Sequence, residues 1–495
     1  MNPMTPSRVF AVAVATLLLG ACAGVPDKIR HVDLRSQAPL AGLPSSSQGS
    51  WPAAAWWKRY HDPQLDRLID RALHDATSLA AARSRVNAAR ASAKLTASQV
   101  GLRINGNVQV ARQRLSENGL IPSQFLGFTW YNQGDIGVQG SYDFDLWGGH
   151  RAEVEAAIGQ VHAAAAERSA AALALQVGIT RTYFGWQADR HRLQLAEQLV
   201  RDQERLVHVF DVRVNAGLEP NDRLQQARAG AAAARQQVAA LRGSAKIRRA
   251  ILAALIGIAP RDLPDLKMRP LPKANAALPA HAGLDLIARR PDIAARRWQV
   301  ESALRQTDAA RAKFFPDFSL NAMAGFSSID LGKLLHPESR VFALTPALHL
   351  PIFEGGLLRA GFGVSKAQLQ SAVAQYNDAV VNAAREVSTQ VLDLQRLRAQ
   401  RHEQQAQLQA VSALQHNAEA RQHQGLTDIQ PVLRARTQVL QQRDAHLQLT
   451  AQILDADVGL IQALGGGYHL EHAPEATDNT ATPAPATSSA RKTTL

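Results

Sequence analysis

One pattern occurs twice along this chain, and this doubling constrains the fold more than any other feature. The segment DLWGGHR at residues 145–151 returns as PIFEGG at residues 351–356 with Arg359 following, and RVNAGL at residues 213–218 returns as RQHQGL at residues 421–426. Further pairs match in the same order, each separated by roughly 210 residues, as expected for an internal repeat. We therefore expect two structural units of one design.

Each half predicts the same order of elements: a helix of medium length, two strands, a very long helix, a tight turn and another long helix. The medium helices are expected at residues 63–100 and 282–313, and the very long helices at residues 151–214 and 357–424. At about 1.5 Å per residue, a helix of roughly 65 residues is a rod on the order of 100 Å long. Ordinary globular helices are far shorter, so these rods need partners along their length.

The second rod carries the seam of a coiled coil. Apolar residues recur at intervals of seven, which places them at the a and d positions of heptads. The two series are Val373, Val380, Val387, Leu394 and Leu408, interrupted by Arg401, and Tyr376, Ala383, Gln390, Leu397, Gln404 and Val411. This seam alone is compatible with a trimeric coiled-coil structural lipoprotein without a pore, and the predicted strands argue against that alternative.

Four segments alternate apolar and polar residues, at residues 102–115, 128–146, 317–329 and 340–353. Such segments, divided by turn residues, are typical of transmembrane strands. Four strands cannot close a barrel, because the smallest transmembrane barrels have about eight, and an open sheet edge is not tolerated in lipid. The pattern predicts a barrel shared by two, three or four copies and does not choose among them.

The N-terminus predicts export and lipid attachment. Arg8 is followed by an apolar run at residues 9–19, which is too short to span a bilayer comfortably and suits a signal peptide. The run leads into Leu-Gly-Ala-Cys, which resembles the lipobox of bacterial lipoproteins and marks Cys22 as the lipidated first mature residue. In the sorting scheme of those lipoproteins, Ala23 after the cysteine implies the outer membrane. Cys22 is the only cysteine, which also excludes an intramolecular disulfide framework.

Together with the lipobox, several motifs resemble the outer-membrane efflux protein family of TolC-like channels, in its lipoprotein branch. They are WWKRYHDPQL at residues 56–65, RPDI at 290–293, FFP at 314–316, the PIFEGG strand exit and the two Gly-Leu turns. The resemblance covers nearly the whole mature chain, up to about Gly467.

The resemblance implies a mainly α fold with a β-barrel part. It implies a homotrimer in which four strands per protomer build one twelve-stranded outer-membrane barrel and long helices form a periplasmic tunnel with a girdle around its middle. It also implies passive conduction of small molecules or drugs, with a periplasmic adaptor protein and an inner-membrane pump as partners and outer-membrane lipids around the barrel. A type I secretion duct of the same design is the alternative within the family. A periplasmic adaptor is a further alternative, but it should carry one hairpin and no barrel strands.

The expected division of the chain follows from these features. Trp51, Trp56 and Trp57 are expected to pack the girdle rather than form a membrane-interface belt, and the glycines at residues 465–467 should stop the last helix. The units are a signal peptide at 1–21, a lipid-anchored segment at 22–62, a first repeat at 63–258, a girdle linker at 259–281, a second repeat at 282–467 and a disordered tail at 468–495.

Two groups of residues are candidates for function. The hairpin tips, to which the resemblance assigns the closed periplasmic aperture and adaptor contact, hold Gly217, Leu218, Gly425, Leu426 and Thr427. Glycine supplies the positive φ that ends a helix tightly, so a simple helix–helix turn is the alternative. Proline ends sheet pairing and glycine lets the chain turn from strand to helix. The strand-to-helix exits hold Trp147, Gly148, Gly149, Pro351, Phe353, Gly355 and Gly356.

The closed end departs from the family pattern of an acidic ring that attracts cations. The usual acidic position after the second turn matches Arg434, and the one after the first turn matches Arg223. Asp222 and Asp428 are the nearest carboxylates. These four residues are candidates for the aperture, with Asp–Arg pairs between hairpins as one hypothesis and solvated helix ends as the other.

No motif indicates an enzyme. The chain lacks a GxSxG elbow, a phosphate-binding loop and an HExxH pair, so we expect no catalytic residues and no cofactor. The histidine pair in HLEH at residues 469–472 borders the tail, and we expect no metal site there. The net charge of +13 is carried mostly by arginines spread along helix faces, which indicates solvated surface rather than a nucleic-acid partner.

Overall fold

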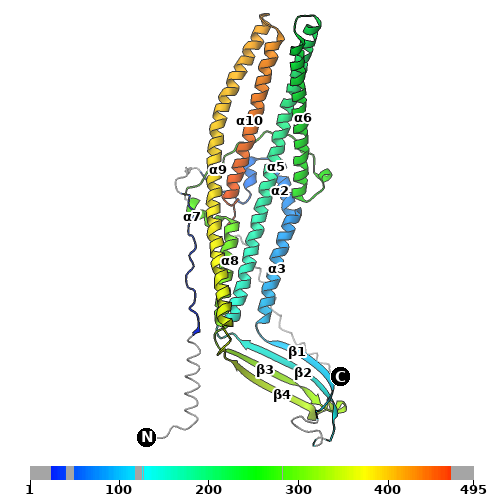
Figure 1. Cartoon of the computed structure of the whole chain (residues 1–495), viewed down its shortest axis with the longest axis vertical. Coiled ribbons are helices and arrows are strands. Elements are labelled where there is room, and N and C mark those ends of the chain that lie inside the picture. The colour runs from blue at the N-terminus through cyan, green and yellow to red at the C-terminus, as the bar shows by residue number, and fades with distance from the viewer. Residues whose placement is uncertain (1–23, 41–48, 117–124, 126, 281, 470–495) are drawn as a thin grey trace, which may run out of the picture.

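The long helices lie side by side and end in a sheet at one extremity of the molecule (Figure 1). The computed structural model describes residues 24–40, 49–116, 125, 127–280 and 282–469. The first half contains η2 (Trp56–Tyr60), α2 (Pro63–Asp75), α3 (Thr77–Gln99), β1 (Arg103–Arg114), β2 (Trp130–Phe144), α5 (Gly149–Asn215) and α6 (Asn221–Ile256). After η3 (Pro260–Asp262) come α7 (Ala282–Arg289), α8 (Pro291–Ala312), β3 (Asp317–Ser328), η4 (Leu331–Lys333), η5 (Pro337–Ser339), β4 (Arg340–His349), α9 (Leu357–His423) and α10 (Ile429–Ala463).

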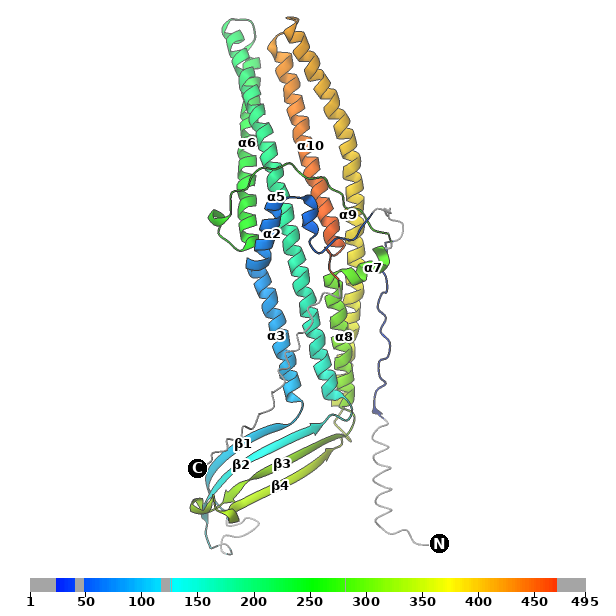
Figure 2. The same ribbon diagram turned by 180° about the vertical axis from the view of Figure 1, so that it is seen from behind.

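The predicted doubling is confirmed. Two long hairpins, α5 with α6 and α9 with α10, run next to each other, and α3 and α8 support their sheet-proximal halves (Figures 1 and 2). The first helix of each hairpin has 67 residues, in agreement with the predicted rods. Within the described residues, no helix is both long and apolar enough to cross a membrane.

The two medium helices differ from the prediction, because each is broken near its start. Ala76 is extended, with ψ 125°, between α2 and α3, and Arg290 is extended, with ψ 123°, between α7 and α8. The second break follows from Pro291, whose ring disfavours a helical conformation in the preceding residue. At the first break, Gly257 packs against the chain so closely that a Cβ there would lie 3.2 Å from the carbonyl oxygen of Asp75.

The four strands form one antiparallel sheet in the order β1-β2-β3-β4. β1 pairs only with β2 and β4 only with β3 in the described part of the chain, so two edges stay open. The strand β4 ends at His349 and not at residue 353 as expected. Pro351, which has no N–H to donate, follows two residues later.

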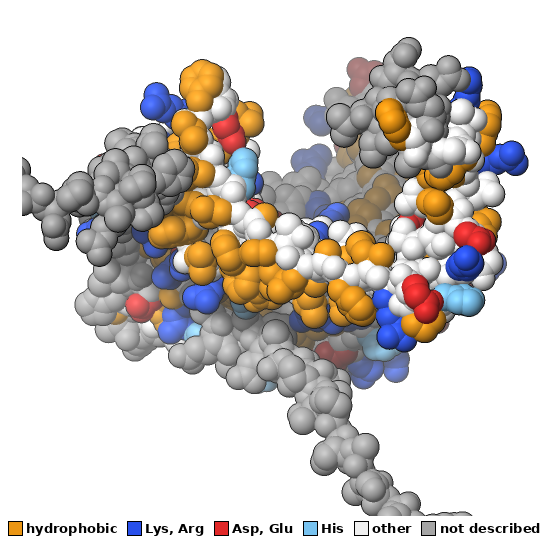
Figure 3. All heavy atoms as spheres, turned by 90° about the horizontal axis from the view of Figure 1, so that it is seen from below, with side chains coloured by type: hydrophobic (Ala, Val, Ile, Leu, Met, Phe, Trp, Pro, Cys, Tyr) orange, Lys and Arg blue, Asp and Glu red, His pale blue; other side chains and the backbone are white. Residues whose placement is uncertain are grey.

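One face of the sheet is apolar. The cross-strand register places Val108 opposite Ile136 and Phe144 opposite Phe318. The row through Phe318 continues on β4 to Leu348, and the row through Ile136 ends there at Arg340. Val108 and Phe342 nevertheless remain 71% and 75% exposed. Hydrophobic side chains gather along the curve of the sheet when the molecule is viewed from this end (Figure 3). An exposed apolar sheet face of this size needs a non-aqueous partner.

The helical core confirms part of the predicted seam. Tyr376, Val380, Ala383, Val387, Leu394 and Leu397 are buried. Gln404, Leu408 and Val411, nearer the tip, are only half-buried. The difference arises because α8 packs against the sheet-proximal half of α9, whereas toward the tip the main partner of α9 among the described helices is α10.

A broad core at mid-height joins the two halves of the chain. Trp56 and Trp57 are buried there, and Trp56 meets Tyr60 edge to face, so the prediction that these tryptophans pack inside is confirmed. Trp51 is half-buried, with the guanidinium of Arg289 4.6 Å from its ring. The expected lipidation site Cys22 and residues 470–495 of the expected tail lie outside the described residues. Tyr468, the first residue of that tail, is described and packs half-buried against a small cluster of alanines.

Candidate functional site

The two hairpin tips are built in the same way, at the end of the molecule farthest from the sheet (Figure 1). Gly217 and Gly425 have φ of 71° and 72°, the left-handed conformation that glycine adopts without strain. The next residues close each turn with one hydrogen bond, from Leu218 N–H to the Arg213 carbonyl at 2.8 Å and from Leu426 N–H to the Arg421 carbonyl at 2.9 Å. This is the Schellman arrangement, which satisfies the last carbonyls of a helix.

The leucines of the tips point away from the core. Leu218 is 70% exposed and Leu426 is 72% exposed, although both are apolar. Thr427 is half-buried between Leu426 and the start of α10. The structure therefore presents one exposed apolar side chain at the end of each hairpin.

An ion pair joins the hairpins just below the tips. Nη1 of Arg213 donates to Oδ2 of Asp428 at 2.6 Å, and Nε of Arg213 lies 3.9 Å from Glu219. The other carboxylate oxygen of Asp428 accepts from the backbone N–H of Gln430 at 3.0 Å, so Asp428 also caps α10. Sequence reasoning named Asp428 but not Arg213, because only the fold brings residues 215 positions apart together.

The remaining aperture candidates do not take part in this pair. Asp222, Arg223 and Arg434 are exposed and make no ion pair within the described part of the chain. Asp222 lies in the first turn of α6, where a carboxylate is favourable next to the helix dipole.

Polar and apolar contacts between α5 and α10 continue below the tips. A small core of Leu206, Phe210, Leu224 and Leu433 joins α5, α6 and α10. Farther down, Arg192 binds Asp444 through two nitrogens, at 2.7 and 3.1 Å. Such two-pronged guanidinium–carboxylate contacts fix geometry as well as charge. The tip pair is therefore the last of several links that hold the hairpins together.

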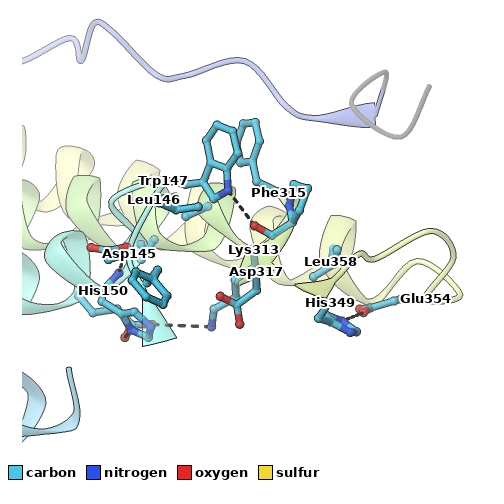
Figure 4. Close-up of a pocket in the computed structure, with 16 residues that line it drawn as sticks. Asp145, Leu146, Trp147, His150, Lys313, Phe315, Asp317, His349, Glu354 and Leu358 are labelled. Atoms are coloured by element: carbon cyan, nitrogen blue, oxygen red, sulfur yellow. Dashed lines mark hydrogen bonds and ion pairs between the residues drawn. The ribbon is translucent and has the colours of Figure 1, made fainter. Parts of the chain in front are cut away.

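A pocket of about 330 Å³ lies between the two strand-to-helix exits and the end of α8 (Figure 4). Of the predicted exit residues, Trp147 and Gly149 line this pocket, and the second exit contributes their neighbours His349 and Glu354. The Trp147 ring stacks on Phe315 with centroids 4.5 Å apart, and its Nε1 donates to the Pro316 carbonyl at 2.8 Å. The carboxylate of Asp145 accepts hydrogen bonds from the backbone N–H groups of His150 and Arg151, at 3.1 and 2.8 Å. Asp145 therefore caps α5 from before the glycines, a role that the sequence analysis missed.

Glycines make both exits possible. Gly148 and Gly356, at the starts of α5 and α9, have φ of 74° and 89°, and Gly149 follows directly as the first residue of α5. Gly355 also has a positive φ, of 58°. Between β4 and α9, Phe353 is 89% exposed. The two exits therefore turn the chain in the same way and leave aromatic side chains at the border between sheet and helices.

The N-terminal segment runs along the helices toward the sheet. Arg35 donates its backbone N–H to Asn377 at 2.9 Å, halfway along the molecule. Nearer the sheet, Nε of Arg311 donates to the Pro26 carbonyl at 2.8 Å and Lys28 lies 3.9 Å from Asp308. The described chain therefore begins close to the helix ends that adjoin the sheet (Figures 1 and 2).

The linker after α6 crosses the helices as an extended strap, residues 263–279. Side chains hold its backbone: Gln64 bonds both the N–H and the carbonyl of Lys267, at 2.9 and 3.1 Å, and Gln187 binds the Arg269 N–H at 2.8 Å. Farther along, the buried carboxylate of Asp457 accepts from the Ala276 N–H. The strap thus connects α5 to α10 around the middle of the molecule.

Buried polar groups reinforce this level. Asp457 also accepts from the Tyr60 hydroxyl at 2.7 Å, and burial together with this carboxylate raises the pKa of Tyr60 far above its ordinary value. Arg290 is buried and binds Asp292 at 2.7 Å, Glu386 at 2.8 Å and the Ala463 carbonyl at 3.0 Å. It therefore ties α8, α9 and the end of α10 together.

The glycines that end α10 have a packing role that the sequence analysis did not foresee. All three have positive φ, in agreement with the predicted helix stop. In addition, a Cβ on Gly465 would overlap the carbonyl of Arg289, and one on Gly467 would overlap the backbone of Ala53. Within the described residues, no group of three or more His, Cys, Asp or Glu side chains is placed to hold a metal ion.

Comparison with known proteins gives consistent matches over nearly the whole chain. The family profile "Outer membrane efflux protein" matches residues 68–258 and 284–466. The chain is 36% identical over 463 residues to the multidrug resistance outer membrane protein MdtP of Escherichia coli O6:H1, covering 92% of this chain and 95% of that protein. It is 34% identical over 475 residues to MdtQ of Escherichia coli O157:H7, covering 92% and 98%.

Solved structures of outer-membrane proteins share the fold. The outer membrane protein VceC from Vibrio cholerae superposes with a TM-score of 0.74 at 30% identity, covering 85% of this chain and all of that chain. The Campylobacter jejuni CmeC outer membrane channel superposes with a TM-score of 0.76 at 22% identity, covering 90% and 94%, a likeness of fold alone.

Proposed function

Because this chain belongs to the outer membrane efflux protein family, we propose that it is the passive exit duct of a tripartite pump for drug-like small molecules. It is an outer-membrane efflux channel, as the family and its full-length relatives establish. The drug class is supported by two sets of relatives that are named multidrug resistance outer membrane proteins. The family and these relatives are channel proteins and not enzymes.

The observation that carries the proposal is the sheet with one apolar face and two open edges, joined to two helical hairpins. Unpaired strand edges are too costly in lipid to persist. Copies of this chain can satisfy one another if β4 of one protomer pairs with β1 of the next. Three copies give the twelve-stranded barrel and the helical tunnel of a homotrimer, with the channel along the common axis.

The attachment to the membrane is proposed at Cys22. The described N-terminal segment supports this, because Pro26 and Lys28 are held against α8 near its sheet-proximal end. A cysteine four residues before Pro26 is within reach of the same membrane surface, since each extended residue spans about 3.3 Å. The acyl chains would then enter the inner leaflet beside the barrel.

The hairpin tips are proposed as the contact with a periplasmic adaptor that joins the duct to an inner-membrane pump. Leu218 and Leu426 supply the exposed apolar contacts, and the Arg213–Asp428 pair holds the hairpins together beside them. Among the sequence candidates, Asp222, Arg223 and Arg434 would contribute charge at the aperture. The strap and its neighbours would form the girdle, at the junction of repeats 63–258 and 282–467.

Conductance in a planar lipid bilayer tests the channel. Purified full-length protein should give rare, small openings, and removal of the Arg213–Asp428 pair should give frequent ones. Restoration of drug resistance in a bacterium lacking its own outer-membrane duct, with the matching pump and adaptor supplied, tests the efflux role. Protein without any conductance, with or without the pair, would refute the channel and leave the pore-free lipoprotein.

A further inference from the structure

An open groove of about 510 Å³ lies between α5 and α6 at the level of the strap. Trp186, which is 4% exposed, lines it from α5, and Leu266 lines it from the strap. The groove also includes residues one to three helical turns farther along α5, so it is elongated along the helix pair.

Cations from two helices converge on this groove. Arg190 extends from α5, and Arg242, Lys246 and Arg249 extend from α6, three and four residues apart and hence on one helix face. Glu197 is the only carboxylate among the lining residues, and it is bound to Arg242 at 2.8 Å. The groove therefore has an excess of positive charge.

Nothing in the described part of the chain neutralises that excess effectively. Arg190 and Lys246 are exposed and make no ion pair there. Asp265 lies 3.8 Å from Arg249 but is fully exposed, so water and salt screen this pair strongly. Many arginines elsewhere on the rods are paired with carboxylates, such as Arg192 with Asp444. Here, in contrast, four cationic side chains surround one cavity with a tryptophan in its wall.

The distance of the groove from the sheet restricts which parts of the cell envelope can bind to it. Arg190 lies about 60 Å along α5 from the sheet, at about 1.5 Å per residue, so the headgroups of the membrane that holds the barrel are out of reach. A tunnel that extends this far from the outer membrane has to pass the cell wall. The peptide stems of that wall carry several carboxylates, and guanidinium groups bind carboxylates through paired hydrogen bonds.

We propose that this groove binds the carboxylate-bearing stem peptides of peptidoglycan and so fastens the duct to the cell wall at mid-height. The inference rests on the proposed function, because it requires the rods to stand in the periplasm with the strap on their outer side. Trp186 and Leu266 contact the apolar part of the peptide. Arg190 and Lys246, which have no partner ion among the described residues, bind its carboxylates.

Co-sedimentation with purified peptidoglycan sacculi tests the proposal on the full-length trimer in detergent. We expect the wild-type protein to pellet with sacculi, and the variant Arg190→Gln/Lys246→Gln to bind about tenfold more weakly, because two unpaired charges are lost. The matched control is Arg90→Gln/Lys94→Gln, which removes one exposed arginine and one exposed lysine from α3. It should bind like wild type.

Three outcomes would overturn the proposal. Wild-type protein that stays in the supernatant does so directly, and so does equal loss of binding in the control, which would indicate non-specific charge attraction. Failure of soluble stem peptide to compete, when glycan strands do compete, would assign the binding to the sugar. Bilayer conductance of the same samples distinguishes the two proposals. A protein that conducts but does not bind sacculi refutes only the proposed peptide-binding groove. A protein that binds sacculi but does not conduct refutes the proposed channel.

Discussion

Nη1 of Arg213, near the end of α5, lies 2.6 Å from Oδ2 of Asp428, the residue that caps α10. Their side chains are 35% and 47% exposed, so the pair contributes on the order of 1 kcal/mol at most. In the proposed aperture, one such link in each protomer would keep the end closed at rest and would still be easy to break.

Removing the charge of Asp428 should therefore make the channel leaky. Asp428→Asn keeps a side-chain oxygen for the N–H of Gln430 and loses the ion pair, so α10 remains capped. Loss of about 1 kcal/mol per ion pair corresponds to roughly a fivefold increase in the equilibrium constant for opening, for each protomer. Single-channel recordings measure this. Arg401→Gln, which removes an exposed arginine of α9 that makes no ion pair within the described residues, is the control, and an equal rise there would contradict the role of the Arg213–Asp428 pair.

The tip leucines should matter for coupling and not for assembly. Leu426→Asn exchanges an exposed apolar side chain for a polar one and should lower drug resistance in cells while the trimer stays intact on a native gel. Leu414→Asn is a matched control, because Leu414 is also exposed and lies on the same hairpin. If resistance is unchanged by Leu426→Asn, adaptor contact does not lie at this tip.

Lipid attachment can be tested separately from the barrel. Cys22→Ser should abolish incorporation of labelled palmitate, because no other cysteine is present to replace it. The protein should still reach the outer membrane fraction to the extent that the barrel anchors it. Labelling that persists in the variant would contradict the lipobox prediction.

The buried Arg290 should be important for stability. Arg290→Met leaves the Ala463 carbonyl without this donor, and it leaves Asp292 and Glu386 without their cation, although water can reach both carboxylates. We expect a loss of about 2 kcal/mol, read as a lower temperature of trimer dissociation. Arg296→Met, on the exposed face of the same helix, should change this temperature little. A similar drop in both variants would argue against a special role for Arg290.

The contribution of Arg290 to the stability of the trimer should also depend on pH. Burial tends to raise the pKa of Asp292, but the hydrogen bond and charge of Arg290 outweigh it, so the pKa lies below its ordinary value. A carboxyl of this kind stabilises the fold above its unfolded pKa, and this contribution is lost as the pH falls through the folded pKa. The difference in dissociation temperature between wild type and Arg290→Met should therefore shrink in acid. A constant difference down to about pH 3 would contradict this assignment.

Periodic features of the molecule were predictable and contacts at long range were not. The alternation of Ile104, Val108 and Val110 indicated a half-apolar strand, and heptads containing Val380 and Val387 indicated a buried seam, because both patterns repeat over many residues. The helix break at Ala76 has no such signal. At this point Gly257, the residue that ends α6, packs against the chain, a contact that no local pattern announces.

The site shows the same division. Gly217 and Gly425 could be named because a helix turn of this kind requires glycine locally. Arg213 could not, since its carboxylate partner lies in the other repeat. Likewise, Gln64 holds the strap through the backbone of Lys267. A glutamine within a helical sequence does not indicate which distant residue it will contact.

The open edges of β1 and β4 also have a consequence for biogenesis. A single copy cannot enter the bilayer alone, so insertion and oligomerisation must be one concerted event whose rate rises steeply with the local supply of chains. Defective protomers would then inactivate the mixed trimers that they enter. In a cell making equal amounts of defective and intact chains, only about one barrel in eight would contain three intact protomers. Mutations in these strands should therefore behave as dominant.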